Sequence, residues 1–445
     1  MIREIGNSES GDAAKNYVLS RGSAMVVMNL ASTALTFLIA VVLARSLGDS
    51  QYGIYAFVMA WVGLLTIPAG LGLPALVTRE SARHSQANDW GLVKGIIRFG
   101  ALAILGVSVV CLLVVPVITR APVMQAFDHP LVAVLLGMAI LPLTGWSRLM
   151  GSAGRGLGQV VWSSFPVQVL QPLLFLVLAG ILFWRFEPAV VTALAGSAVS
   201  WAIVLVVVTL IVLRSIPGQQ RQTPAVMTPR VWLRNSMFFM VSGGGFYINS
   251  RADVLMLGFF ESPEKLGAYN VAARTATILG IALSATAAAI APRVVRYYRE
   301  NNTRDLQSLL SSASRLAFAV TLPQVLIVLV FGSTLLAWVF GPEYREGYLP
   351  LVILSLSQLA SVGFGSVGMV LNMTGHERLT ATGVWVGATF NIVANLCLIP
   401  LWGITGAAIA TASSILVWNG LLYWLVRRRL RIDPSIFARH KVVAG

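Results

Sequence analysis

The stretch FFMVSGGGFYINSRADVLMLGFF, residues 238–260, is almost entirely apolar, yet it contains Arg251 and Asp253. A run of about 20 apolar residues is long enough to cross the hydrocarbon core of a bilayer as a helix. A charged side chain at mid-membrane costs about 2.5–3.5 kcal/mol on insertion scales, so it usually faces a protein interior or a water-filled cavity. The stretch therefore predicts a membrane span with a polar site inside the membrane.

The rest of the chain has the composition of a membrane protein. Of its 445 residues, 57% are hydrophobic and only 11% are charged, whereas about a quarter of the residues of a soluble domain are charged. Helices satisfy their own backbone in lipid, and the alternating ten-residue strands of a barrel are missing. We predict an all-α integral membrane protein with twelve transmembrane helices, at 23–44, 52–76, 96–118, 131–150, 161–183, 190–213, 237–260, 267–291, 316–338, 347–371, 380–400 and 404–426.

The two halves of the chain resemble each other. SQYGIYAF (50–57) follows the first predicted span and EKLGAYNV (264–271) follows the seventh, so that Gly53 and Tyr55 match Gly267 and Tyr269. Six plus six spans in the same sense form a parallel repeat, which places a substrate site between the halves near the midplane. The expected organisation is two pseudo-symmetric six-helix lobes at 1–213 and 236–426, a cytoplasmic linker at 214–235 and a basic cytoplasmic tail at 427–445.

The net charge of +15 follows from membrane topology. If both termini are cytoplasmic, 25 Lys and Arg residues fall on the inside and 5 on the outside. This asymmetry is the positive-inside rule, and it predicts cytoplasmic termini. We expect a multi-pass protein of a bacterial cytoplasmic (inner) membrane, in contact with membrane lipids and not with nucleic acid.

Motifs of catalysis and metal binding are missing from the sequence. It contains no GxxxxGK[ST], HExxH or GxSxG pattern, and its four histidines are scattered through loops without ligand spacing. Cys111 and Cys397 lie in apolar runs, as small core residues do. We therefore expect a transporter rather than an enzyme, with no cofactor and no metal site.

Arg251, Asp253 and Arg274 are the candidate site residues inside the membrane. Asp253 lies seven residues before the outer end of its span and Arg274 seven residues after the outer start of the next, so the two could pair. Arg251 lies two residues from Asp253 and would not face it on a helix. It is expected either to line a wet cavity that receives an anion, or to be satisfied by backbone carbonyls or by snorkelling. Asp253 is the one buried acid available for coupling to protons or sodium.

Several longer segments carry a family resemblance. RADVLMLGFFESPEKLGAYNVAAR (251–274) resembles the junction of spans 7 and 8 in oligosaccharide flippases of the polysaccharide transporter branch of the MATE-like (MOP) superfamily. The same family pattern is followed, in the same order, by GSAGRGLGQVVWSSFP (151–166), FGPEYREGYLPLVILS (340–355), LNMTGHE (371–377) and LIPLWGITGAAIATASS (398–414). The resemblance covers nearly the whole chain.

This resemblance implies a V-shaped pair of lobes and a specific substrate. Members of the family move polyprenyl-diphosphate-linked oligosaccharide repeat units from the inner to the outer leaflet by alternating access through a cationic cavity. The products are cell-surface polysaccharides such as lipopolysaccharide or exopolysaccharide. A polysaccharide polymerase complex is a further candidate partner.

We expect Arg251 to contact the diphosphate, while Asp253 and Arg274 shape the cavity or form a pair. Asn249 and Asn29 are candidates for bonds to sugar hydroxyls. Arg79 and Arg293, near the inner span ends, could meet the headgroup on entry, although topology explains them equally well.

The alternative function is a MATE-type exporter of cationic drugs, coupled to a cation gradient. Such an exporter needs intramembrane carboxylates, and the spans of the first half contain none. Two arginines in the cavity would also repel a cation.

Overall fold

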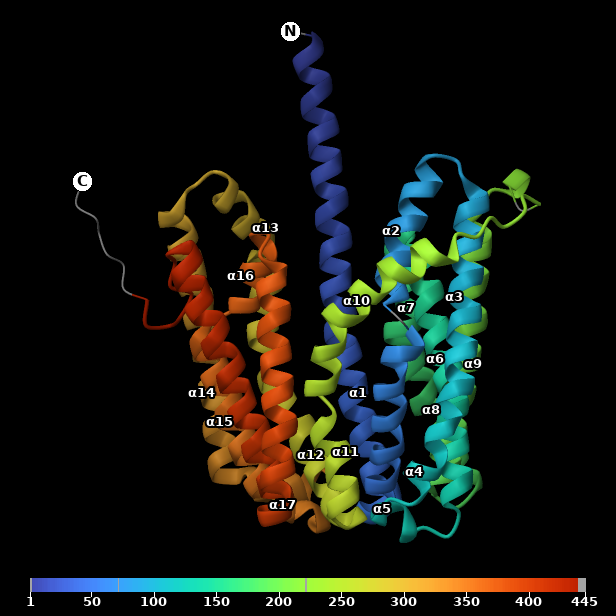
Figure 1. The fold of residues 1–445 in the computed structure, drawn as a ribbon. Helices are drawn as coiled ribbons and strands as arrows, with labels where there is room; N and C mark the ends of the chain where they lie inside the picture. The colour runs from blue at the N-terminus through green and yellow to red at the C-terminus, as the bar shows by residue number, and fades with distance from the viewer. Residues whose placement is uncertain (1, 71, 221, 439–445) are drawn as a thin grey trace.

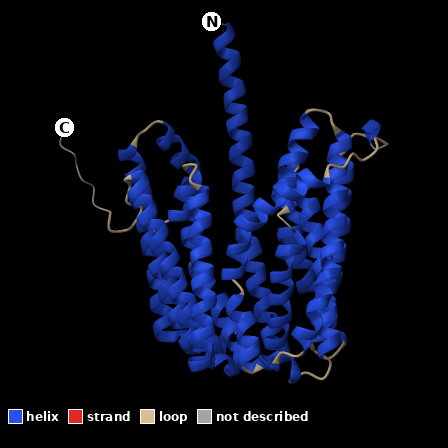
Figure 2. Cartoon of the chain, viewed as in Figure 1, coloured by secondary structure: helices blue, strands red, loops and turns tan. Residues whose placement is uncertain are grey.

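The computed structural model describes residues 2–70, 72–220 and 222–438. These residues form helices joined by short loops, and no strand occurs among them (Figure 2).

The first lobe is built from α1 to α9. Gly48, with φ 73°, reverses the chain within α1, so that α1 supplies two consecutive spans. Gly72, with φ 68°, precedes α2, which continues the second span. The helices are α1 (Ile2–Gly70), α2 (Leu73–Gln86), α3 (Trp90–Cys111), α4 (Val115–Thr119), α5 (Pro122–Gln125), α6 (Pro130–Gly156), α7 (Val160–Phe165), α8 (Gln171–Arg185) and α9 (Val190–Ser215).

The second lobe is built from α10 to α17. Gly403, with φ 53°, reverses the chain within α17 in the same way, and Gly365 separates α15 from α16. The helices are α10 (Pro229–Asn249), α11 (Ala252–Phe260), α12 (Pro263–Leu279), α13 (Ile281–Arg299), α14 (Thr303–Val339), α15 (Tyr348–Phe364), α16 (Val367–Met373) and α17 (Glu377–Leu430).

The predicted twelve-span, two-lobe architecture is confirmed. Among the described residues, nine helices are long and apolar enough to cross a membrane. Two of these, 24–70 and 377–430, turn back at Gly48 and Gly403 and cross twice. The broken helix α10–α11 supplies the twelfth crossing.

The two lobes converge at one end and diverge at the other (Figure 1). The start of α1, the linker and residues 432–438 lie at the divergent end, which we call the basic face. The loops around Gly48, Pro263 and Gly403 lie at the convergent end, which we call the opposite face.

The glycines that the repeat aligns meet where the lobes converge. A Cβ on Gly53 would overlap the carbonyl oxygen of Pro263, and a Cβ on Gly267 would overlap that of Asp49. Only glycine permits such close backbone contact. The hydroxyl of Tyr52 accepts a 2.9 Å hydrogen bond from Asn270 beside them. The lobes therefore join at the opposite face through residues of both repeats.

The linker packs on the first lobe. Its Val226 donates a 2.9 Å hydrogen bond to the carbonyl of Gly91, and Lys94 donates to the carbonyls of Gln220 at 2.6 Å and Thr223 at 2.8 Å. Helix α10 begins at Pro229, inside the predicted linker 214–235. The helix begins before the predicted span because its first turns carry polar side chains and precede the apolar run.

The predicted tail 427–445 begins as helix, since α17 continues to Leu430. The next residues then dock on α14 and α15. Ser314 donates a 2.7 Å hydrogen bond to the carbonyl of Pro434, and Arg315 donates to those of Ile436 and Ala438. The last residues of the tail, 439–445, lie outside the described ranges.

Candidate functional site

The membrane span that contains Arg251 and Asp253 is broken into two helices, and Arg251 lies at the break. The expected span 237–260 was a single helix, but α10 ends at Asn249 and α11 begins at Ala252. Arg251 lies at the break, where its N–H donates a 3.1 Å hydrogen bond to the carbonyl of Ile248. A helix C-terminus favours positive charge and an N-terminus favours negative charge. The break thus gives Asp253 the favourable first turn of α11, while Arg251 is the N-cap of that helix and follows the C-cap of α10, Ser250.

Asp253 is held by neutral donors. Its side chain, 5% exposed, accepts hydrogen bonds from the hydroxyls of Tyr269 at 2.5 Å and Thr411 at 3.4 Å and from the N–H of Val254 at 2.8 Å. It forms no ion pair with Arg274. The pairing of Asp253 with Arg274 that the sequence left open does not occur. Tyr269, from the helix that carries Arg274, donates a hydrogen bond to the carboxylate instead.

A chain of buried polar side chains extends from Asp253 into α17. Asn391 donates to the hydroxyls of Thr411 and Ser414, both at 3.3 Å. Ser414 in turn donates to Asn249 at 3.3 Å. Asn395 donates to the side-chain oxygen of Asn391 at 3.0 Å, while its own Oδ1 is buried without a hydrogen-bond partner. The network therefore joins the broken span α10–α11 to both spans of α17.

Arg251 and Arg274 lie near enough to the lobe junction to interact electrostatically with each other and with tyrosines of the first lobe. The charge of Arg274 acts on Arg251, and both arginine charges act on Tyr52 and Tyr55 of the first lobe. Neither arginine takes part in an ion pair within 4.0 Å in the described part of the chain. The Nε of Arg274 is buried without a hydrogen-bond partner. Two cationic groups therefore interact electrostatically, and neither has a carboxylate within ion-pair distance, although the charge of Asp253 acts on Arg251.

Arg148 is a further polar residue, which the sequence analysis did not single out although it lies within the predicted span 131–150. Helix α6 continues to Gly156, so Arg148 is two turns inside it. Its guanidinium donates a 3.3 Å hydrogen bond to the hydroxyl of Tyr247 on α10, across the two lobes. The signal was weak, because the sequence around Arg148 is rich in small and polar residues.

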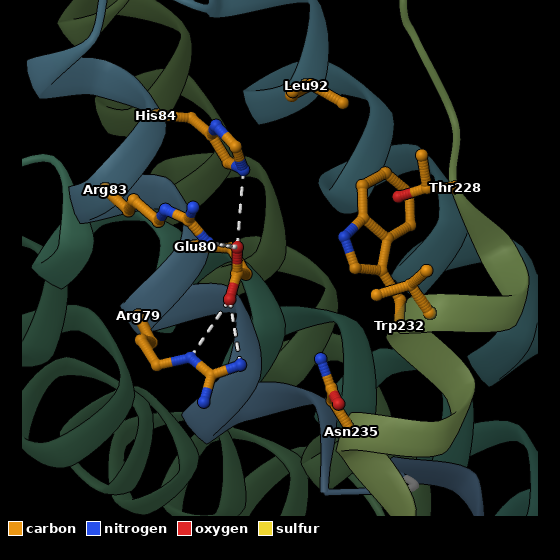
Figure 3. Close-up of a pocket in the computed structure, with 9 residues that line it drawn as sticks. Arg79, Glu80, Arg83, His84, Leu92, Thr228, Trp232 and Asn235 are labelled. Atoms are coloured by element: carbon orange, nitrogen blue, oxygen red, sulfur yellow. Dashed lines mark hydrogen bonds and ion pairs between the residues drawn. The ribbon is translucent and has the colours of Figure 1, made fainter.

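The other predicted residues lie away from the arginine pair. Asn29 is exposed on α1, about 19 residues and therefore about 28 Å along the helix from the opposite face. Arg293 is exposed on α13 towards the basic face. Arg79 lies at the basic face too, on α2, where it lines a cavity with Glu80 and Trp232 (Figure 3). Arg251, Asp253, Arg274 and Asn249 are thus brought together, whereas these three are not.

Comparison with known families gives two matches. A family described as polysaccharide biosynthesis protein matches residues 18–298, which is more than half of the chain. A second family, described as MatE, matches residues 245–414.

Individual relatives agree with these matches. The chain is 27% identical, over 88% of its length and 80% of the relative, to a probable low-salt glycan biosynthesis flippase, Agl15, of Haloferax volcanii. Two solved structures share the fold. An inward-facing multidrug resistance MATE transporter has a TM-score of 0.72 and 15% identity, covering 91% of this chain and 98% of its own. The lipid II flippase MurJ, in an inward closed conformation, has a TM-score of 0.71 and 11% identity. The match covers 90% of this chain and 87% of the MurJ chain. These names are those of transporters, in agreement with the expectation that the chain is not an enzyme.

Proposed function

The chain belongs to the polysaccharide biosynthesis protein family, and from this premise we propose that it is a flippase for lipid-linked glycans. Its substrate is a polyprenyl-diphosphate-linked oligosaccharide repeat unit, moved from the inner to the outer leaflet. The named flippase relative and the fold shared with a lipid II flippase support this class of substrate.

The observation that carries the proposal is the arginine pair at the lobe junction. The charges of Arg251 and Arg274 act on each other, and neither side chain forms an ion pair with any described residue. Burying like charges side by side is costly unless an anion arrives to neutralise them. A diphosphate offers several negative oxygens, which suit the planar fork of a guanidinium. We propose that these two arginines hold the diphosphate while Asn249 bonds the glycan.

We infer a direction of transport from the shape of the molecule and from its charge. We propose that the basic face is cytoplasmic, as the excess of Lys and Arg there favours. The lobes are then closed on the outer side, by Tyr52–Asn270 and by the Tyr344 hydroxyl, which donates to the carbonyl of Ala44 at 3.1 Å. This is the state that loads substrate from the cytoplasm. The bacterial location stays a prediction, because the named relative belongs to Haloferax volcanii.

We propose that Asp253 couples transport to an ion gradient. It is a buried carboxylate with three neutral donors and no ion pair. Binding of a proton or a cation would neutralise this buried charge and remove the cost of its desolvation. Binding or release of that ion would act on the break at Arg251, two residues away. Removal of the transported product by a polysaccharide polymerase complex is a second candidate source of energy.

The alternative function is export of organic cations, which the match to the MatE family favours. The arginine pair argues against it, because a cationic drug would be repelled from the place where the lobes meet. Asp253 is hydrogen-bonded to Tyr269 and Thr411, and its charge also acts on Arg251.

Native mass spectrometry of the gently purified protein tests the proposal. We expect a co-purified polyprenyl-diphosphate glycan on the wild type and on Arg304→Gln, which removes an exposed arginine from the start of α14. We expect Arg251→Ala to lose it, since charge-assisted hydrogen bonds of about 1.5–3 kcal/mol disappear. Bulk phospholipid alone, together with saturable binding of organic cations, would support the drug exporter instead.

A further inference from the structure

A separate cavity lies at the basic face, between α2, α3 and the first turns of α10 (Figure 3). Its volume is about 530 Å³, within the range of small-molecule sites. The residues lining it are Arg79, Glu80, Arg83, His84, Leu92, Thr228, Val231, Trp232 and Asn235. It is distinct from the arginine pair at the lobe junction, and none of the lining residues belongs to the Asp253 network.

One wall of the cavity is a cationic cluster organised by Glu80. Its buried carboxylate, 8% exposed, binds Arg79 at 2.9 Å, His84 at 3.3 Å and Arg83 at 4.0 Å. The side chains of Arg79 and Arg83 nevertheless remain 52% and 75% exposed. Two arginines against one glutamate leave the wall with a net positive charge. Glu80 therefore holds Arg79 in place and lies at the limit of ion-pair distance from Arg83. Outside the lining, Asp89 lies 3.7 Å from His84.

The facing wall supplies neutral donors from α10. The indole nitrogen of Trp232 and the amide of Asn235 are turned towards the cavity (Figure 3). Trp232 is 3% exposed and packs in the core of the first lobe. Donors thus converge from both walls, and the one carboxylate among the lining residues is already bound to bases. Such an arrangement suits an anion with several acceptor oxygens.

We propose that this cavity binds the phosphate of a lipid headgroup. Basic pockets between helices at the cytoplasmic end of a membrane protein are suited to anionic headgroups. Leu92 and Val231 provide apolar surface for the first carbons beyond the phosphate. The phosphate can come from a bilayer phospholipid or from a polyprenyl diphosphate. The second source rests on the proposed function, whereas the first does not.

Binding there would tie α10 to α2. The start of α10 is already held on the first lobe by Trp232 and by the linker, through Val226 and Gly91. Its other end carries Asn249, which bonds to Ser414 of the second lobe. Helix α10 therefore runs from one lobe to the other, and a phosphate bridging Arg83 and Asn235 stabilises the arrangement seen in this structure.

Lipid titrations of the delipidated full-length protein, followed by native mass spectrometry, test the site. The probes are phosphatidylglycerol and an undecaprenyl diphosphate. The variants are Arg83→Gln, whose side chain is mostly exposed, and Arg79→Gln; Arg304→Gln is the matched control. We expect Arg83→Gln and Arg79→Gln each to bind at least one of the two lipids about tenfold more weakly than the wild type does. The reason is that each variant loses a charge-assisted hydrogen bond. Arg304→Gln is expected to bind as the wild type does.

The two sources give different patterns. If the variants bind only phosphatidylglycerol more weakly, the ligand of the cavity is a bilayer lipid. If they bind undecaprenyl diphosphate more weakly, the ligand is the substrate headgroup. Unchanged binding of both probes in Arg83→Gln, or equal weakening in Arg304→Gln, would overturn the proposal. Arg251→Ala separates it from the proposed function, because that variant is expected to keep the phosphate cavity intact while losing the glycan at the lobe junction.

Discussion

Arg251 and Asp253 lie at a break within one membrane span. A continuous helix would have left both charges against lipid or a dry interior, at about 2.5–3.5 kcal/mol each. The break places Asp253 in the first turn of α11, where the helix dipole stabilises its negative charge, and Arg251 at the N-cap of α11, directly after the C-cap of α10 at Ser250. Asp253 is then enclosed by Tyr269 and Thr411, and the charge of Arg274 acts on Arg251. One short segment therefore presents a cationic group at the lobe junction and an acidic group inside the lobe.

Replacing Tyr269 by Phe tests how Asp253 is held. Tyr269 is fully buried and donates a 2.5 Å hydrogen bond to the carboxylate. Removing the hydroxyl leaves a buried carboxylate short of a donor, so we expect a loss of stability of about 1–3 kcal/mol. The measurement is thermal unfolding in detergent, with Tyr298→Phe, a partly exposed tyrosine, as control. A melting temperature equal to that of the control would contradict this account of Asp253.

The sequence identified Arg251, Asp253 and Arg274 because charges are rare in apolar runs. It could not determine their partners. The pairing of Asp253 with Arg274 was reasonable from depth alone, but depth does not give the direction in which a side chain points around its helix. Tyr269, five residues before Arg274, faces Asp253 instead. Arg148, near the end of the predicted span 131–150, was not singled out because nothing in its local sequence indicates that it contacts Tyr247 of the other lobe.

At the scale of elements, glycine residues occupy the positions where a helix reverses direction between two spans. Gly48 and Gly403, both with positive φ, reverse α1 and α17 between expected spans. The break at Ser250–Arg251 has no glycine or proline, and the triple glycine at 243–245 lies within α10. A sequence pattern cannot detect a break that is stabilised by the surrounding polar network. The docking of the linker and of residues 432–438 is likewise a tertiary effect, made through backbone carbonyls.

Replacing Gly53 by Ala tests the junction at the opposite face. A Cβ there would overlap the carbonyl of Pro263, so the lobes must shift apart, at a cost of about 1–3 kcal/mol. Gly63 lies on the same helix, and a Cβ added there would meet no atom within 4 Å. Gly63→Ala is therefore the matched control and is expected to be neutral or slightly stabilising.

Spin labels on the two lobes report the shift. Glu187 and Arg345 are exposed at the opposite face, one on each lobe, and can carry labels after Cys111 and Cys397 are replaced. We expect the distance distribution between the labels to move to longer values in Gly53→Ala. An unchanged distribution would mean that this glycine contact does not hold the lobes together.

At the scale of the whole molecule, the two repeats meet through equivalent residues. Gly53 and Gly267, aligned from the sequence, lie in contact at the opposite face. Phe57 and Phe259 pack edge to face at 5.9 Å beside them. Transport by alternating access requires this junction to open as the lobes approach each other at the basic face. The twelve spans and the repeat could be read from hydropathy and spacing; the conformation could not, since both states share one sequence.

Flipping measured in reconstituted vesicles tests the central claim most directly. A polyprenyl-diphosphate glycan with a fluorescent sugar is placed in proteoliposomes, and its passage between leaflets is followed by quenching from outside. We expect the wild type and Arg304→Gln to flip it, and Arg251→Ala to slow flipping by at least about tenfold, because the diphosphate loses its charge-assisted contacts. Wild-type flipping by a properly folded Arg251→Ala, or no flipping by the wild type, would contradict the account.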